Sequence, residues 1–172
     1  MILTGAGQIG MAIARRMGYG MKIVVGDKRM ENAQSMADTM NRAGFDVLPV
    51  EMDLSSRESI LHLIDTAQQY GEIAMLVNAA GVSPSQASIE TILKVDLYGT
   101  AVLLEEVGKS SCGEVQALQS PVNPDIVCQH LVRKPMSCWL VHQLKDYWIS
   151  KFCNHNISMI HSMHTSWLNV VM

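Results

Sequence analysis

Apolar residues in the first 109 positions follow two alternating spacings along the chain. Short apolar runs of strand length occupy 1–4, 21–27, 45–53 and 72–81, and the run 21–27 is rich in β-branched residues. After each run, apolar residues recur three and four positions apart, which predicts amphipathic helices. Strands that alternate with helices are typical of a parallel sheet covered by helices on both faces. The predicted fold class is therefore α/β.

Helix start and stop signals divide this pattern into separate elements. Ser55 and Glu58 form a capping-box pattern before the third predicted helix, and Gly71 ends that helix. A longer helix is predicted from about Ser88 to Val107.

A glycine-rich turn joins the first predicted strand to the first predicted helix. Gly5, Gly7 and Gly10 form the pattern G-x-G-x-x-G, with Gln8 and Ile9 between the last two. In such a turn the first glycine permits a tight bend, the second lets a pyrophosphate approach the backbone, and the third lets helix and strand pack closely. The helix N-terminus offers N–H groups to the phosphates. The turn therefore predicts a dinucleotide-binding site.

Asp27 ends the second predicted strand, 22 residues after Gly5. A carboxylate at this place can bind the hydroxyls of the adenosine ribose. The alternative is that the glycines only close a turn and that Asp27 only caps the next helix. Together, the turn and the carboxylate favour a dinucleotide.

Five segments of residues 1–109 together form a recognisable series: TGAGQIG at 4–10, Asp27, MDLSS at 52–56, NAAG at 78–81 and KVDLYGT at 94–100. In these segments, their order and their spacing, the chain resembles the short-chain dehydrogenase/reductase family. The resemblance implies a Rossmann-type sheet, incomplete over this length. It also implies an oxidoreductase that transfers hydride between nicotinamide and an alcohol or ketone. One departure is Asp96, because the family has an asparagine here that supports a proton-relay water.

The resemblance also implies which residues bind the cofactor. Asp53 and Leu54 would lie beside the adenine, and the segment 78–81 would line the cofactor path. Asp27 implies NAD, because a carboxylate repels the 2′-phosphate of NADP, while the neighbouring Lys28 and Arg29 keep NADP open as an alternative. The predicted cofactor-binding residues are Gly5, Gly7, Gln8, Ile9, Gly10, Asp27, Lys28, Asp53, Leu54, Asn78, Ala79, Ala80 and Gly81.

The composition of the chain changes near residue 110. Residues 1–109 hold 11 of the 12 glycines and 12 of the 13 alanines, whereas residues 110–172 hold all four cysteines, all three tryptophans and five of the six histidines. We therefore predict a dinucleotide-binding half domain at 1–109 and a non-family tail at 110–172 that is partly helical.

The tail contains one candidate for the family's catalytic pair, a tyrosine followed four residues later by a lysine. Tyr147 and Lys151 have these types and this spacing, and in an intact dehydrogenase they would be the acid–base pair. The segment FCNHN after Lys151 favours a turn, and no Ser-x-x-Gly precedes Tyr147 at a usable distance. We therefore expect Tyr147 to pack on a helix, and we assign no catalytic residue. The chain is then a truncated and catalytically impaired dehydrogenase.

A shifted reading frame would explain both the change of composition and the missing catalytic site. With a shift of one base, codons from His164 to Asn169 can encode Tyr-x-Leu-Ala-Lys, and codons from Pro121 to Asp125 can encode Ser-Gln-Ser-Gly. We therefore predict a frameshifted tail. The alternative is a non-catalytic NAD-binding or scaffold protein with a genuine Cys/His-rich tail. Because the Cys and His spacing fits no closed zinc module, we assign no metal ligand.

Charge and hydropathy restrict the partners. The chain is 48% apolar with a net charge of −3, and it has no basic block that would indicate nucleic acid. It has no signal-peptide pattern, and no apolar run approaches the roughly 18 residues of a membrane helix. We expect a cytoplasmic protein that binds a dinucleotide and a small alcohol or ketone. The tail is not expected to supply strands, so the open sheet edge would favour homo-oligomers or aggregation.

Overall fold

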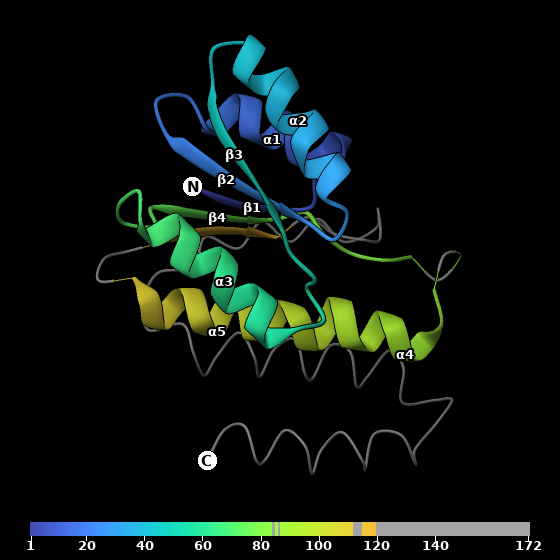
Figure 1. The fold of residues 1–172 in the computed structure, drawn as a ribbon. Helices are drawn as coiled ribbons and strands as arrows, with labels where there is room; N and C mark the ends of the chain where they lie inside the picture. The colour runs from blue at the N-terminus through green and yellow to red at the C-terminus, as the bar shows by residue number, and fades with distance from the viewer. Residues whose placement is uncertain (84, 86, 112–114, 120–172) are drawn as a thin grey trace. The chain divides into compact units, whose positions relative to one another are not determined.

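The computed structural model describes residues 1–83, 85, 87–111 and 115–119, and these residues form a parallel sheet with helices on both faces (Figure 1). The strands are β1 (Ile2–Thr4), β2 (Lys22–Asp27), β3 (Asp46–Glu51), β4 (Met75–Asn78) and β5 (Gln116–Gln119). Their order in the sheet is β3-β2-β1-β4-β5, and every neighbouring pair is parallel. The predicted α/β, Rossmann-type fold is confirmed.

The helices alternate with the first four strands along the chain. They are α1 (Gln8–Met17), α2 (Met30–Arg42), α3 (Arg57–Gln68), α4 (Ile89–Ile92), the π-helical segment η1 (Leu93–Gly99) and α5 (Thr100–Ser110). Figure 1 shows α1 and α2 on one face of the sheet and α3 and α5 on the other. Because both faces are covered, the strands consist largely of apolar residues, as the sequence shows.

Alternate residues of the central strands enter two separate cores. In β1, Ile2 packs in the core that contains α3 and α5, whereas Leu3 packs in the core that contains α1 and α2. Val24 and Val25 of β2 divide in the same way. Successive side chains of a strand point to opposite faces, so one short apolar run serves both cores.

Helix α3 begins one residue later than the sequence predicts. Ser56 is its N-cap, and the Ser56 hydroxyl oxygen accepts a hydrogen bond from the Ser59 N–H. Ser55 instead donates to Oδ1 of Asp53, through its N–H at 2.8 Å and through its hydroxyl at 2.7 Å. The predicted capping box of Ser55 and Glu58 is therefore wrong, because the Asp53 carboxylate holds Ser55 in the turn before the helix.

The long helix predicted from about Ser88 to Val107 is confirmed, with one addition. Ser88 caps α4 by accepting a hydrogen bond from the Thr91 N–H at 3.3 Å, and helical structure continues through η1 to the end of α5. The π-helical turn in its middle was not predicted. Such turns occur frequently at functional sites, and η1 contains Asp96.

The fifth strand comes from residues beyond the predicted boundary at 110. β5 pairs with β4, with Met75 opposite Gln116 and Asn78 opposite Gln119. The expectation that the tail supplies no strand is therefore wrong, and the edge expected at β4 is covered. Four residues that begin and end with glutamine carry little strand signal. Pairing with β4 and the burial of Ala117 favour the strand instead.

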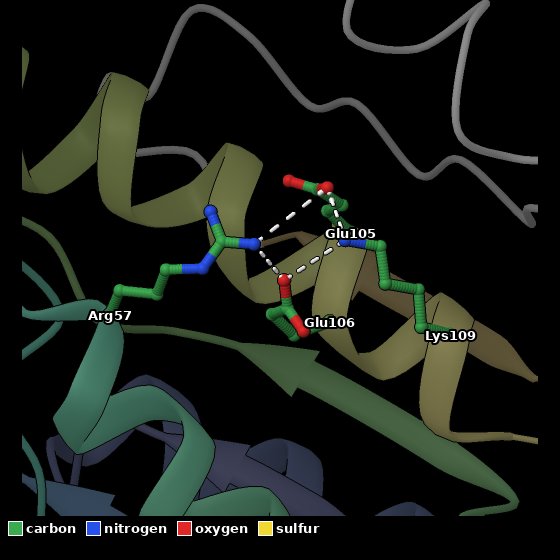
Figure 2. Close-up of polar contacts among 4 residues, drawn as sticks. All are labelled: Arg57, Glu105, Glu106 and Lys109. Atoms are coloured by element: carbon green, nitrogen blue, oxygen red, sulfur yellow. Dashed lines mark hydrogen bonds and ion pairs between the residues drawn. The ribbon is translucent and has the colours of Figure 1, made fainter. Parts of the chain in front are cut away.

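A network of charged side chains joins the start of α3 to α5 (Figure 2). The Arg57 guanidinium contacts the Glu106 carboxylate and lies 3.8 Å from Oε1 of Glu105. Lys109 contacts Glu105 and lies 3.2 Å from Oε1 of Glu106. The Glu106 side chain is only 11% exposed, so its charge requires these partners. The network fixes α5, and through it η1, against α3.

Candidate dinucleotide site

The predicted cofactor residues gather at or just beyond the carboxyl ends of four strands. Thr4, the last residue of β1, lies opposite Gly26 in β2 and Asn78 in β4. The chain runs from β1 outward to β3 on one side and then returns to β4 on the other. In open α/β sheets, ligands bind outside the carboxyl ends of the strands where the order reverses in this way.

Gly5 and Gly10 are required by the fold itself. Gly5 has a φ of +88°, which favours glycine, and a Cβ there would lie 2.6 Å from the backbone nitrogen of Ala80. A Cβ at Gly10 would overlap the carbonyl oxygen of Gly5 and would lie 3.4 Å from the Leu3 side chain. The first glycine therefore permits the bend, and the third lets α1 pack closely against β1.

Gly7 differs from these two glycines, because the protein itself leaves room for a side chain there. Gly7 is the N-cap of α1, with an extended backbone that any residue adopts, and no neighbouring atom lies within 4 Å of a Cβ built on it. Gln8 and Ile9 follow it, and both are exposed. The N–H groups in the first turn of a helix have no acceptor within the helix, so they can bind an anion. The space in front of Gly7 suits a phosphate.

Asp27 connects the end of β2 to the glycine turn. Its Oδ2 accepts a hydrogen bond from the Ala6 N–H at 2.9 Å. Its Oδ1 accepts hydrogen bonds from the Arg29 N–H at 3.0 Å and from Nδ2 of Asn32 at 3.3 Å. An ionised carboxylate has about four acceptor positions, so Asp27 retains capacity for a ribose hydroxyl.

Lys28 and Asp53 form an ion pair beside Asp27. Lys28 Nζ lies 2.9 Å from Oδ2 of Asp53, and the two side chains are 74% and 34% exposed. Burial acts to raise the pKa of Asp53, but hydrogen bonds from Lys28 and Ser55 outweigh it and lower the pKa below its usual value. Asp53 is therefore ionised at neutral pH.

Asn78 lies in a buried polar network at the end of β4. The Thr4 hydroxyl donates to Oδ1 of Asn78, and Nδ2 of Asn78 donates to the Thr100 hydroxyl at 3.1 Å. The Ala79 N–H donates to the Thr4 carbonyl at 2.8 Å. These bonds join β1, β4 and α5, and they fix the chain direction where the segment 78–81 leaves the sheet. Ala80 is half-buried and Gly81 is exposed.

Asp96 holds the loop that follows Gly81. Its Oδ1 accepts a hydrogen bond from the Val82 N–H at 3.0 Å. Burial raises the pKa of the Asp96 carboxyl to about 6, against the opposing effect of the Val82 hydrogen bond. Leu54 is buried in the core and packs against Gly99, so its predicted place beside the adenine stays a prediction.

Several predicted features lie outside the described residues. These include Tyr147, Lys151 and the cysteines and histidines of the tail. Within the described part of the chain there is no group of three or more His, Cys, Asp or Glu side chains that could hold a metal ion. None of the described helices is long and apolar enough to cross a bilayer.

Sequence reasoning missed the ion pair between Lys28 and Asp53 and the threonine partners of Asn78. Each pair joins segments that are far apart in the chain, so no local pattern indicates it. The strand order β3-β2-β1-β4 brings these residues together. The pairing of the successive strands β2 and β3 was an available signal for Lys28 and Asp53, whereas β1 and β4, which hold Thr4 and Asn78, are not successive.

Comparison with known proteins agrees with this architecture. A model of the short chain dehydrogenase family matches residues 1–110. The short-chain dehydrogenase/reductase bsc3 of Alternaria brassicicola is 35% identical over 142 residues, which cover 77% of this chain and 52% of that protein. The cis-4-hydroxycyclohexanecarboxylate dehydrogenase of Sinomonas cyclohexanicum is 30% identical over 116 residues, 66% of this chain and 46% of that protein. The chain belongs to the short-chain dehydrogenase family.

Solved structures show the same fold. The citronellol catabolism dehydrogenase of Pseudomonas aeruginosa PAO1 matches with a TM-score of 0.61 and 26% identity, over 69% of this chain and 53% of that chain. A variant of the actinorhodin polyketide ketoreductase, solved with NADPH, matches with a TM-score of 0.62 and 24% identity over 69% of this chain and 51% of that one. The present chain thus spans about half the length of the relatives it matches.

Proposed function

We propose that this chain binds NAD at the glycine turn and forms the nucleotide-binding part of an oxidoreductase. The reaction class is hydride transfer between nicotinamide and an alcohol or ketone carbon. The observation that carries the proposal is the convergence of the glycine turn, Asp27 and the segment 78–81 at the reversal of strand order. Membership of the dehydrogenase family supports the reaction class.

Each part of the site has a distinct task in this proposal. The first-turn N–H groups of α1 bind the pyrophosphate, and Gly7 lets it approach the backbone. Asp27 accepts hydrogen bonds from the adenosine ribose. Asp96 holds Val82, and so fixes the loop beyond Gly81 along the cofactor path. The bound nicotinamide supplies the hydride chemistry.

NAD rather than NADP is proposed because of the charges near the ribose. Asp27 and Asp53 are both acidic, and Lys28, one of two exposed cations that follow Asp27, already pairs with Asp53. A 2′-phosphate at this place would meet the uncompensated charge of Asp27. NADPH in the actinorhodin ketoreductase is the cofactor of that protein.

Replacing Gly7 with alanine tests the proposed binding mode. The protein has room for this Cβ and the backbone there is extended. Alanine is a poorer N-cap than glycine but lowers the entropy of the unfolded chain, so we expect only a small change in the melting temperature. The methyl group would fill the space proposed for the pyrophosphate, and the Kd for NAD is expected to rise about tenfold, which is about 1.4 kcal/mol. Isothermal titration calorimetry on the full chain measures this.

Gly108→Ala is the matched control, because its Cβ also meets no neighbouring atom and it lies in α5 away from the turn. It is expected to leave the Kd for NAD unchanged. Equal affinity of the wild type and Gly7→Ala would refute the binding mode, and a wild type that binds no NAD would refute the proposed function.

Hydride transfer by this chain is proposed to be weak. Residues 1–109, which carry the family motifs, do not include the tyrosine and lysine that form the family's acid–base pair. A positioned acid or base typically raises the reaction rate about 10²- to 10⁴-fold. We therefore expect little or no reduction of NAD by alcohols in a spectrophotometric assay. Robust turnover that disappears in Tyr147→Phe would contradict the impairment and would assign the acid–base role to Tyr147.

A further inference from the structure

Lys28, a cation beside the proposed ribose site, is already engaged by the protein. Asp27 ends β2, and Lys28 follows it directly, yet Lys28 Nζ contacts Oδ2 of Asp53 at 2.9 Å. No carboxylate other than Asp53 forms an ion pair with Lys28 in the described residues. Asp27 is instead hydrogen-bonded to the backbone N–H groups of Ala6 and Arg29.

Asp53 is the fixed partner in this pair, and Lys28 is the movable one. Oδ1 of Asp53 accepts hydrogen bonds from both the N–H and the hydroxyl of Ser55. The Asp53 N–H in turn donates to the Ser59 hydroxyl at 2.9 Å. The Lys28 side chain is 74% exposed and has a flexible aliphatic stem, so the position of its ammonium group is set by the attraction of the Asp53 carboxylate.

A 2′-phosphate on the adenosine ribose requires a cation near the end of β2. If Lys28 turned toward such a phosphate, it would leave Asp53, and the phosphate would then face both Asp27 and Asp53. An exposed ion pair is weak enough to be broken, at a cost of the order of a few-fold in an equilibrium constant. The pair therefore opposes NADP without affecting NAD, which has no 2′-phosphate.

We propose that Asp53 is a cofactor-specificity residue, which disfavours 2′-phosphorylated nucleotides by holding the Lys28 ammonium away from the 2′ position. This proposal rests on the proposed NAD site at the glycine turn. In this arrangement the Asp53 carboxylate, on the loop after β3, neutralises the Lys28 ammonium, on the loop after β2.

The test compares two pairs of ligands that differ only in the 2′-phosphate. These are NADP with NAD, and adenosine 2′,5′-bisphosphate with AMP. Dissociation constants are measured by isothermal titration calorimetry on the full chain. Any change that Asp53→Asn makes to adenine contacts affects both ligands of a pair equally, so the ratio of the two Kd values isolates the effect on the 2′-phosphate.

Asp53→Asn is expected to lower the ratio of the NADP Kd to the NAD Kd about threefold to tenfold, because Lys28 is released. The double variant Asp53→Asn/Lys28→Ala is expected to lose this gain. If the double variant kept the gain, then the lost negative charge or Arg29 would be responsible, and the proposal would be wrong. An unchanged ratio in Asp53→Asn would also overturn it.

Two further variants complete the design. Lys28→Ala changes an exposed side chain and is expected to raise the ratio about threefold, so it tests the proposal even if Asp53→Asn folds poorly. An unchanged ratio there would overturn the proposal. Asp46→Asn is the matched control, since Lys22 and Asp46 form a similar ion pair at the opposite end of β2 and β3; it is expected to leave the ratio unchanged.

The outcomes separate this inference from the proposed function. The role of Asp53 would be refuted, and the proposed function retained, if the wild type binds NAD, Gly7→Ala weakens that binding, and no variant changes the ratio of the NADP Kd to the NAD Kd. A wild type that binds neither dinucleotide would overturn both.

Discussion

Replacing Gly99 with alanine is expected to lower the free energy of unfolding by about 2–3 kcal/mol. Gly99 ends η1 and packs directly on the loop after β3. A Cβ there would overlap the carbonyl oxygen of Leu54 and lie 2.8 Å from Leu54 Cγ. The obstacle is mainly backbone, which cannot rotate away as a long side chain can. The backbone of Gly99 has ordinary helical angles, so its helix propensity alone would favour alanine.

Gly108→Ala is the matched control, and it is expected to change stability in the opposite direction. Gly108 lies within α5, and no atom lies within 4 Å of a Cβ built there. Alanine in place of a helical glycine should add about 0.5–1 kcal/mol. Chemical denaturation followed by circular dichroism measures both variants. A Gly99→Ala protein as stable as the wild type would show that η1 does not pack on Leu54 in solution.

Replacing Asp96 with asparagine is expected to stabilise the protein at neutral and alkaline pH. The folded-state pKa of about 6 lies above the ordinary value of 3.8, because burial penalises the charged carboxylate. Between these two values the native state binds more protons than the unfolded state, so the stability of the wild type falls as pH rises. Asparagine removes this cost and can still accept the hydrogen bond from Val82 through its side-chain oxygen.

At about pH 8, Asp96→Asn is expected to raise the free energy of unfolding by about 2 kcal/mol, after allowance for the partial exposure of the site. At about pH 5 the gain should be about half as large, since Asp96 is then largely protonated in the folded state. Denaturation curves at both pH values measure this difference. Asp65→Asn, on the exposed face of α3, removes the same formal charge without relieving a burial cost and is the matched control. A pH-independent gain for Asp96→Asn would contradict the explanation by burial.

Some features of the site follow from local patterns alone. The spacing of Gly5, Gly7 and Gly10 predicted a turn before a helix, and the structure places it between β1 and α1. The same pattern predicted a different role for each of the three glycines, and the structure shows that their surroundings differ. The backbone of Ala80 lies against Gly5, the carbonyl oxygen of Gly5 lies against Gly10, and the space beside Gly7 is open.

The boundaries of the helices and strands depended more on tertiary contacts than on local sequence patterns. Ser55 had the residue type of an N-cap, but Asp53 engages it in a turn, and Ser56 caps α3 instead. β5 carries little periodic signal and is a strand because β4 offers it hydrogen-bonding partners. The π-helical turn at Asp96 likewise had no local signal that separated it from an ordinary helix.

The sequence by itself determined the alternation of strands and helices, the parallel sheet, the glycine turn and the acidic end of the second strand. These features follow from short-range periodicity and backbone preferences, which any window of the chain displays. The tertiary structure alone decided which distant groups meet: Lys28 with Asp53, Asn78 with Thr4 and Thr100, and the Asp96 carboxylate with the Val82 backbone N–H. The physical reason is that strand order and burial set these distances and charges, and neither is a property of neighbouring residues.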